Sequence, residues 1–166
     1  MSRTSFFVAL ALVVPATGFA QALPATAPGN SLQGVWKVTE RTVTGGANPG
    51  PRAVLPNLYF FTQKHYSITA VNGAKPRTAY APAKDPAKLT DAEKLARFEE
   101  WNMFTANSGT YEIRGSTITM HPLVAKNQGV MDGAPFDRSF SLEGNTLWLV
   151  QKDSTSETRS KLTRIE

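Results

Sequence analysis

The sequence predicts an all-β protein, folded as an eight-stranded antiparallel up-and-down barrel with one inserted helix. Eight segments alternate apolar and polar residues with the period of two that is typical of half-buried strands. Most of these segments are joined by short turns, and strands do not alternate with helices as a parallel sheet requires. An open sandwich is the alternative, but sandwiches usually need longer crossovers. An eight-stranded barrel has an interior that side chains fill or that holds one small ligand.

Residues 1–22 are expected to be a signal peptide and not part of the fold. Arg3 precedes an apolar run, 6–14, which is too short to span a bilayer. Ala20-Gln21-Ala22 is a small-x-small cleavage pattern, with cleavage after Ala22 and Ala20 as the second choice. An uncleaved anchor is the alternative, but Pro-rich sequence follows at once. We therefore expect a secreted or periplasmic protein with no stable membrane span after cleavage.

The rest of the chain suits a single domain. Removing 22 of 166 residues leaves enough chain to bury a proper core, with 23–31 as a flexible leader and 32–166 as the domain. There is no cysteine, so neither a disulfide nor thiol chemistry is available. The net charge of +5 is mild and the basic residues are dispersed, so we expect no nucleic-acid partner. The sequence carries no signal for an oligomeric state.

The first three predicted strands cover 34–44, 58–62 and 65–71. In the first, Trp36, Val38, Glu40 and Thr42 share one face, and Lys37, Thr39 and Arg41 share the other. A turn rich in Gly and Pro, 45–51, follows it. Gln63-Lys64 joins the second and third strands as a hairpin.

One helix is predicted at 91–104, after an irregular excursion over 74–88. Thr90 and Glu93 have the spacing of a capping box, in which each side chain bonds to the other residue's backbone N–H. Apolar residues fall on one side of the helix, namely Ala92, Leu95, Phe98 and Met103. We expect this side to pack over one mouth or flank of the barrel.

Five further strands are predicted at 110–114, 117–121, 136–143, 146–152 and 159–165. Gly115-Ser116 turns the first pair, and a loop, 122–135, follows it. Trp148 is out of phase with Leu147 and Leu149, which places it on the outer face. There it could lie beneath the helix and meet Phe98.

The two ends of the predicted barrel resemble a known family. Gly34-Val35-Trp36 is similar to the motif of the first lipocalin strand, and Arg164 stands where lipocalins place an arginine on that tryptophan. Further segments resemble bacterial secreted lipocalin-like proteins, namely Lys64-His65-Tyr66-Ser67, 106–112 and 142–147. The resemblance covers 32–165 and implies that Gly34, Trp36 and Arg164 close the barrel structurally. The helix at 91–104 departs from the family, whose helix follows the last strand.

Two charged residues are the candidates for a site inside the barrel. Glu40 is in phase with Trp36 and Val38, and Arg138 is in phase with the apolar residues of its own strand. A buried charge without a partner is costly, so the two should pair with each other or with a ligand. In this interpretation Arg138 binds a ligand carboxylate, and Tyr66, Tyr111 and Met120 line the same cavity. The alternative is a salt bridge at the rim, or a strand end where alternation fails.

The function expected from these patterns is non-enzymatic binding of a small hydrophobic molecule. One such molecule is an apolar acid whose carboxylate is held by Arg138. An enzyme that uses Glu40 as a general acid or base is one alternative. A solid barrel serving as an interaction domain is another. No nucleophile elbow, phosphate loop or dinucleotide fingerprint is present, so we expect no catalytic motif and no cofactor. His65 and His121 are both out of phase with the apolar faces, so we expect no metal site.

Overall fold

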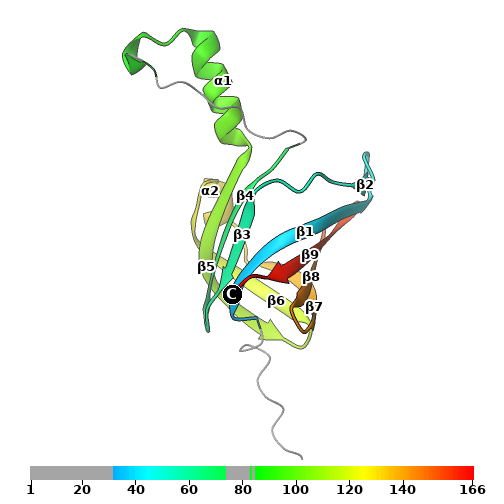
Figure 1. The fold of residues 1–166 in the computed structure, drawn as a ribbon. Helices are drawn as coiled ribbons and strands as arrows, with labels where there is room; N and C mark the ends of the chain where they lie inside the picture. The colour runs from blue at the N-terminus through cyan, green and yellow to red at the C-terminus, as the bar shows by residue number, and fades with distance from the viewer. Residues whose placement is uncertain (1–31, 74–82, 84) are drawn as a thin grey trace, which may run out of the picture.

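The chain folds into a closed antiparallel barrel of eight strands with one short extra strand (Figure 1). The computed structural model describes residues 32–73, 83 and 85–166. The predicted signal peptide, 1–22, and leader, 23–31, lie outside the described residues, as does much of the predicted excursion over 74–88. The predicted fold class is confirmed.

The barrel strands follow one another around the wall in chain order. They are β1 (Gly34–Gly45), β3 (Asn57–Phe61), β4 (His65–Val71), β5 (Phe104–Arg114), β6 (Thr117–Ala125), β7 (Phe136–Glu143), β8 (Thr146–Lys152) and β9 (Ser156–Arg164). The barrel closes because β9 pairs with β1 over most of its length. The extra strand, β2 (Gly50–Pro51), lies within the predicted turn at 45–51 and pairs with Thr42 and Val43.

Two strands are longer than predicted, and a short helix lies in a predicted loop. β5 begins at Phe104 and β6 ends at Ala125, so this hairpin extends well beyond the predicted 110–114 and 117–121. The helix α2 (Gln128–Met131) begins after Asn127, whose side chain accepts from the Gly129 N–H. The first part of β5 was not predicted because its inward residues, Thr105 and Asn107, are polar and line the cavity, so the sequence there shows no apolar alternation.

Trp36 closes one end of the barrel. Its side chain is fully buried, and its indole Nε1 donates a hydrogen bond of 2.9 Å to the carbonyl of Leu32. The Arg164 guanidinium lies 4.1 Å from the centroid of the Trp36 ring and donates to the carbonyl of Gln33. The stacking that the lipocalin resemblance implies is therefore present, and it joins the first and last strands.

A glycine is required at position 34, where the start of β1 passes close to the C-terminal residues. Its φ is +134°, in a region that side-chain-bearing residues rarely adopt. A Cβ atom added there would lie 2.3 Å from the carbonyl oxygen of Glu166. This close contact allows backbone pairing between the two segments, in which the Ile165 N–H donates a hydrogen bond of 2.7 Å to the Val35 carbonyl.

A β-bulge reverses the two faces of β1. Val38 is opposite Leu162 on β9, but Glu40 is opposite Lys161, so Thr39 is an extra residue on β1. Side chains before the bulge follow the predicted alternation, and Trp36 and Val38 point inward. Beyond the bulge the odd positions face the interior, so Arg41 replaces Glu40 on the inner face.

The contact between β1 and β3 is short and is completed by a side chain. Backbone pairing covers only residues 34–36 of β1. Beyond it, the buried Asn57 side chain accepts a hydrogen bond of 2.7 Å from the Val38 N–H and donates one of 3.4 Å to the Val38 carbonyl. An amide side chain thus continues the ladder where the two backbones separate.

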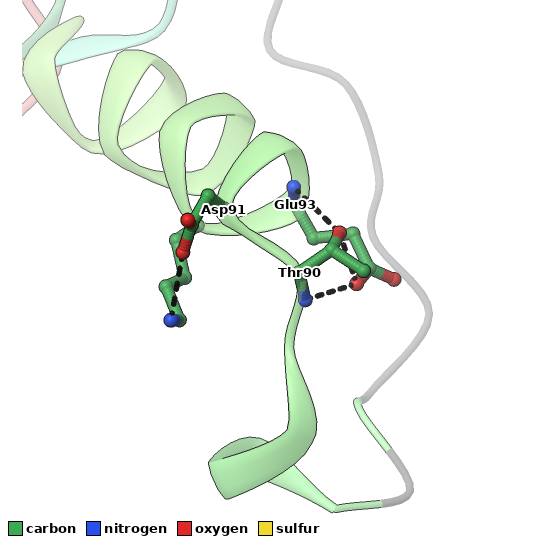
Figure 2. Close-up of polar contacts among 4 residues, drawn as sticks. Thr90, Asp91 and Glu93 are labelled. Carbon is green, nitrogen blue, oxygen red and sulfur yellow. Dashed lines mark hydrogen bonds and ion pairs between the residues drawn. The ribbon is translucent and has the colours of Figure 1, made fainter.

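The helix α1 (Asp91–Asn102) begins at Thr90 with the predicted capping box (Figure 2). The Thr90 hydroxyl accepts from the Glu93 N–H at 3.3 Å, and the Glu93 carboxylate accepts from the Thr90 N–H at 2.8 Å. The helix projects away from the barrel and leads into β5 through Met103 (Figure 1). No helix in the described part of the chain is long and apolar enough to span a membrane.

The predicted packing of this helix over a mouth or flank of the barrel is wrong. More than half of each of its main apolar side chains is exposed, namely Leu95, Phe98 and Trp101. Because only one residue separates α1 from β5, the helix leaves along the direction of the strand. Trp148 is on the outer face as predicted, but it lies beneath Arg159, 4.1 Å from its ring centroid, and not beneath Phe98.

Candidate functional site

The interior of the barrel is divided into a packed half and a hollow half. The half nearer Trp36 is filled by buried side chains, which are Val38, Tyr59, Phe61, Tyr66, Ile68, Tyr111, Ile118, Met120, Leu147, Leu149 and Leu162. The other half contains a cavity of about 200 Å³. Its lining comes from seven of the barrel strands and from Asn72, which follows β4, and includes Arg41, Tyr59, Ile68, Ala70, Asn72, Thr105, Asn107, Arg138, Leu149, Gln151, Thr158 and Ser160. The barrel is therefore filled with side chains at the Trp36 end and hollow at the other end.

Arg138 reaches this cavity from β7. Its strand alternates regularly, so the side chain is on the same inner face as Phe136 and Phe140. One guanidinium nitrogen donates to the Gln151 Oε1 at 3.3 Å, and the guanidinium lies 5.5 Å from the centroid of the Phe136 ring. The Nε atom is buried and has no hydrogen-bond partner. Arg138 forms no ion pair with any described carboxylate, so its charge faces the cavity uncompensated.

Arg41 is a second cation in the same cavity. It lies on β1 beyond the bulge, opposite Ser160 of β9. The side chain is half-buried, and its Nε atom is also buried without a partner. Within the described residues, Arg41 has no ion pair either.

Two neutral polar groups are buried close to these cations. The Asn107 Oδ1 lines the cavity, and the Tyr66 hydroxyl lies in the packed half; neither has a hydrogen-bond partner. Burial raises the pKa of the Tyr66 phenol, and the positive charge of Arg138 acts on that pKa in the opposite direction. Tyr66 therefore remains a neutral donor within the electrostatic reach of Arg138.

The three other side chains predicted to line the cavity do not lie on its wall. Tyr66, Tyr111 and Met120 belong to the packed half beneath it. The Tyr111 hydroxyl donates a hydrogen bond of 2.7 Å to the Thr62 carbonyl, and burial raises the pKa of this phenol. These residues form the floor that supports the cavity.

The predicted inward position of Glu40 is wrong. Its carboxylate is on the outer surface, where the Lys161 Nζ lies 2.7 Å away. The cause is the bulge at Thr39, which turns Glu40 out and Arg41 in. Glu40 and Arg138 therefore do not pair, and Glu40 is not available as a cavity acid or base. The described lining contains no carboxylate and no histidine.

Of the polar residues of the lining, only Arg138 was predicted from the sequence, and Gln151, Asn107 and Arg41 are among those that were not. Gln151 continues the alternation of Leu147 and Leu149, and Asn107 continues that of Tyr111, so both could have been found by extending their strands. Arg41 could not have been found in this way, because a bulge of one residue leaves no mark in the spacing. The register with β9 and the ion pair of Glu40 with Lys161 on the outer surface reveal the bulge.

The histidines lie outside this cavity. His65 is exposed, and the His121 Nε2 lies 3.9 Å from a carboxylate oxygen of Glu112. In the part of the chain that the structure describes, no three His, Asp or Glu side chains gather where they could hold a metal ion.

Eight antiparallel strands in up-and-down order, closed by pairing of the first and last, are the architecture of lipocalins. The barrel is lipocalin-like. No family model matches the sequence, and no curated protein matches it. The description as lipocalin-like therefore rests on the structure itself, which has Gly34 and Trp36 at the start of its first strand, Arg164 stacked on Trp36, and a partly hollow interior.

Two solved structures are similar to this chain. One is a lipocalin-like protein from Bacteroides uniformis ATCC 8492, with 15% identity and a TM-score of 0.46, covering 81% of this chain and 99% of that chain. The other is an uncharacterized protein from Bacteroides eggerthii DSM 20697, with 8% identity and a TM-score of 0.42, covering 80% of this chain and 98% of that chain. At these identities the likeness concerns the fold alone.

Proposed function

We propose that this protein is exported and binds a small organic acid inside its lipocalin-like barrel, with the carboxylate of the ligand on Arg138. The pattern of residues 1–22 supports export. The single observation that carries the binding proposal is the Arg138 guanidinium, which lines the cavity and forms no ion pair with any described carboxylate. The fold supplies the enclosed interior that such a ligand requires.

The chemistry of Arg138 favours an acid as the ligand. A guanidinium presents planar donors that match the two oxygens of a carboxylate, and such charge-assisted hydrogen bonds are stronger than neutral ones. The Gln151 Oε1 accepts a hydrogen bond of 3.3 Å from one nitrogen of the guanidinium and so restrains the position of the group at the cavity wall.

The rest of the lining limits the ligand's size and polarity. Tyr59, Ile68 and Leu149 present a buried apolar surface that suits a short hydrocarbon body. The cavity has a volume of about 200 Å³. This is below the range of roughly 300–1,000 Å³ that is usual for pockets that enclose drug-sized molecules. The expected ligand is therefore a short-chain acid, not a long lipid.

The test is a titration of the mature protein with short-chain carboxylic acids and with their neutral amides, followed by calorimetry. We expect the acids to bind and Arg138→Gln to weaken them about 10- to 100-fold, as the loss of a charged hydrogen bond implies. Arg159→Gln is the matched control, since it removes an arginine from the outer surface. Equal binding of acid and amide, or an unchanged affinity in Arg138→Gln, would contradict the proposal. The mass of the exported protein should correspond to a chain that begins at Leu23.

A further inference from the structure

The cavity holds two cations, although the binding of one carboxylate needs only one. Arg41 and Arg138 both line it, each with a buried Nε that has no partner. We infer that the ligand is a small dianion whose two negative charges are shared between Arg41 and Arg138. This inference rests on the proposed function and specifies the class of acid that the barrel takes.

The topology places the two guanidinium groups on different sides of the cavity. Around the closed wall, β1 is followed by β9, β8 and β7, so Arg41 and Arg138 are three strands apart out of eight. A ligand held by Arg138 alone would therefore leave Arg41 facing it from another wall. A second negative charge on the ligand satisfies both groups at once.

No carboxylate among the described residues neutralises these charges. Glu40, adjacent to Arg41 in sequence, points to the outer surface and pairs with Lys161 at 2.7 Å. The described lining has no aspartate or glutamate, so the interior carries a double positive charge. Like charges in a shared, partly desolvated space repel each other, and a dianion replaces this repulsion with attraction.

The neutral groups around the cavity also suit oxygen-rich ligands. Asn107, Gln151 and Ser160 present amide and hydroxyl groups on the wall. Together with two guanidinium groups they provide many donors in a small volume. A dicarboxylate and a phosphate monoester both meet this description, because each is a compact dianion rich in acceptors.

The experiment compares ligands that differ by a single charge. The full mature chain is titrated by calorimetry, with NMR chemical shifts for weak binding, against succinate and against succinamate, its monoamide of equal size. We expect succinate to bind about 10- to 100-fold more tightly than succinamate. Arg41→Gln should lower the affinity for succinate by a similar factor while leaving that for succinamate within about threefold. Arg159→Gln, on the outer surface, should keep the wild-type ratio, and thermal unfolding checks that each variant is folded.

The outcomes separate this inference from the proposed function. If succinate and succinamate bind equally and methyl phosphate binds no more tightly than either, or if Arg41→Gln binds each dianion as tightly as the wild type does, the dianion inference is overturned while monoacid binding by Arg138 stands. If no acid binds, both are overturned. A further arm uses methyl phosphate as the probe. Tighter binding of methyl phosphate than of succinate, weakened in both Arg variants, supports a phosphate monoester as the dianion, and the reverse order supports a dicarboxylate.

Discussion

At the scale of single residues, one extra residue determines the chemistry of the interior. Glu40 and Arg41 are neighbours in the chain, and the bulge at Thr39 decides which of them enters the barrel. With regular pairing, the cavity would contain a carboxylate beside Arg138. With the bulge it contains a second guanidinium, and Glu40 pairs outside with Lys161. The charge of the expected ligand follows from this one irregularity.

Two arginines stack on tryptophan rings, and comparing them isolates the contribution of Arg164 to barrel closure. Arg164 lies 4.1 Å from the Trp36 ring centroid and is partly buried, whereas Arg159 lies 4.1 Å from that of Trp148 and is exposed. Desolvation strengthens a cation–π contact from about 0.5–1 kcal/mol to about 2 kcal/mol. We predict that Arg164→Ala lowers the free energy of unfolding by about 2 kcal/mol.

The control is Arg159→Ala, for which we expect a loss of no more than about 1 kcal/mol. Both values come from the midpoint and slope of urea unfolding. Equal losses in the two variants would show that Arg164 contributes no more to closure than a surface contact does.

At the scale of elements, the strands that line the cavity differ in composition along their length. β5 is apolar where it faces the packed half, with Tyr111 and Ile113, and polar where it faces the cavity, with Thr105 and Asn107. β8 changes in the same way from Leu147 and Leu149 to Gln151. Each of these elements therefore carries one part of the boundary between packed core and cavity.

The helix α1 is stabilised at its own start more than by the barrel. Its apolar side chains are exposed, and a helix of this length is marginal in water without support. We predict that Thr90→Ala, which costs about 0.5–2 kcal/mol of local helix stability, lowers the helical circular dichroism signal. The unfolding midpoint of the barrel should stay unchanged. Thr90→Ser, which keeps the hydroxyl, should behave like the wild type.

The same capping box makes this helix sensitive to pH. Hydrogen bonds from the backbone and side chain of Thr90 hold the pKa of Glu93 below its usual range. A carboxyl whose pKa is lowered by folding stabilises the fold above its ordinary pKa, and that contribution is lost as the pH falls through the lowered value. The helical signal of the wild type should therefore decrease as the pH falls through that value, and Glu93→Gln, which has no carboxyl to protonate at this position, should show a smaller decrease. An equal decrease in the two proteins would count against the role of Glu93.

At the scale of the whole molecule, the barrel is complete without the connection between β4 and β5, which contains α1. Val71 of β4 pairs with Phe104 of β5, and the Asn72 N–H donates a hydrogen bond of 2.6 Å to the Met103 carbonyl. The two strands thus form a hairpin whose ends already meet, and the segment between 72 and 103 is an insertion in the connection. The cavity wall is formed by barrel strands and by Asn72, not by α1.

We predict that the barrel tolerates removal of this insertion. Replacing residues 73–102 with Asn-Gly, a sequence that favours two-residue hairpin turns, should leave a single cooperative transition. The melting temperature should change by no more than about 4–8 °C, the shift that 1 kcal/mol causes in a small domain. The affinity for short-chain acids should be retained. Loss of cooperative unfolding would show that the projecting segment holds the barrel together.

The amino-acid sequence by itself determined the barrel class and the capping box, which follow from local alternation, from turn residues and from the spacing of Thr90 and Glu93. The contact of Arg164 with Trp36 was implied by the resemblance to lipocalins. Only the tertiary structure decided that Arg41 and not Glu40 faces the cavity, and that α1 leaves the barrel with its apolar face exposed. A bulge depends on the register with the partner strand, and the direction of a helix depends on the strand that it joins, so neither is encoded in residue spacing alone.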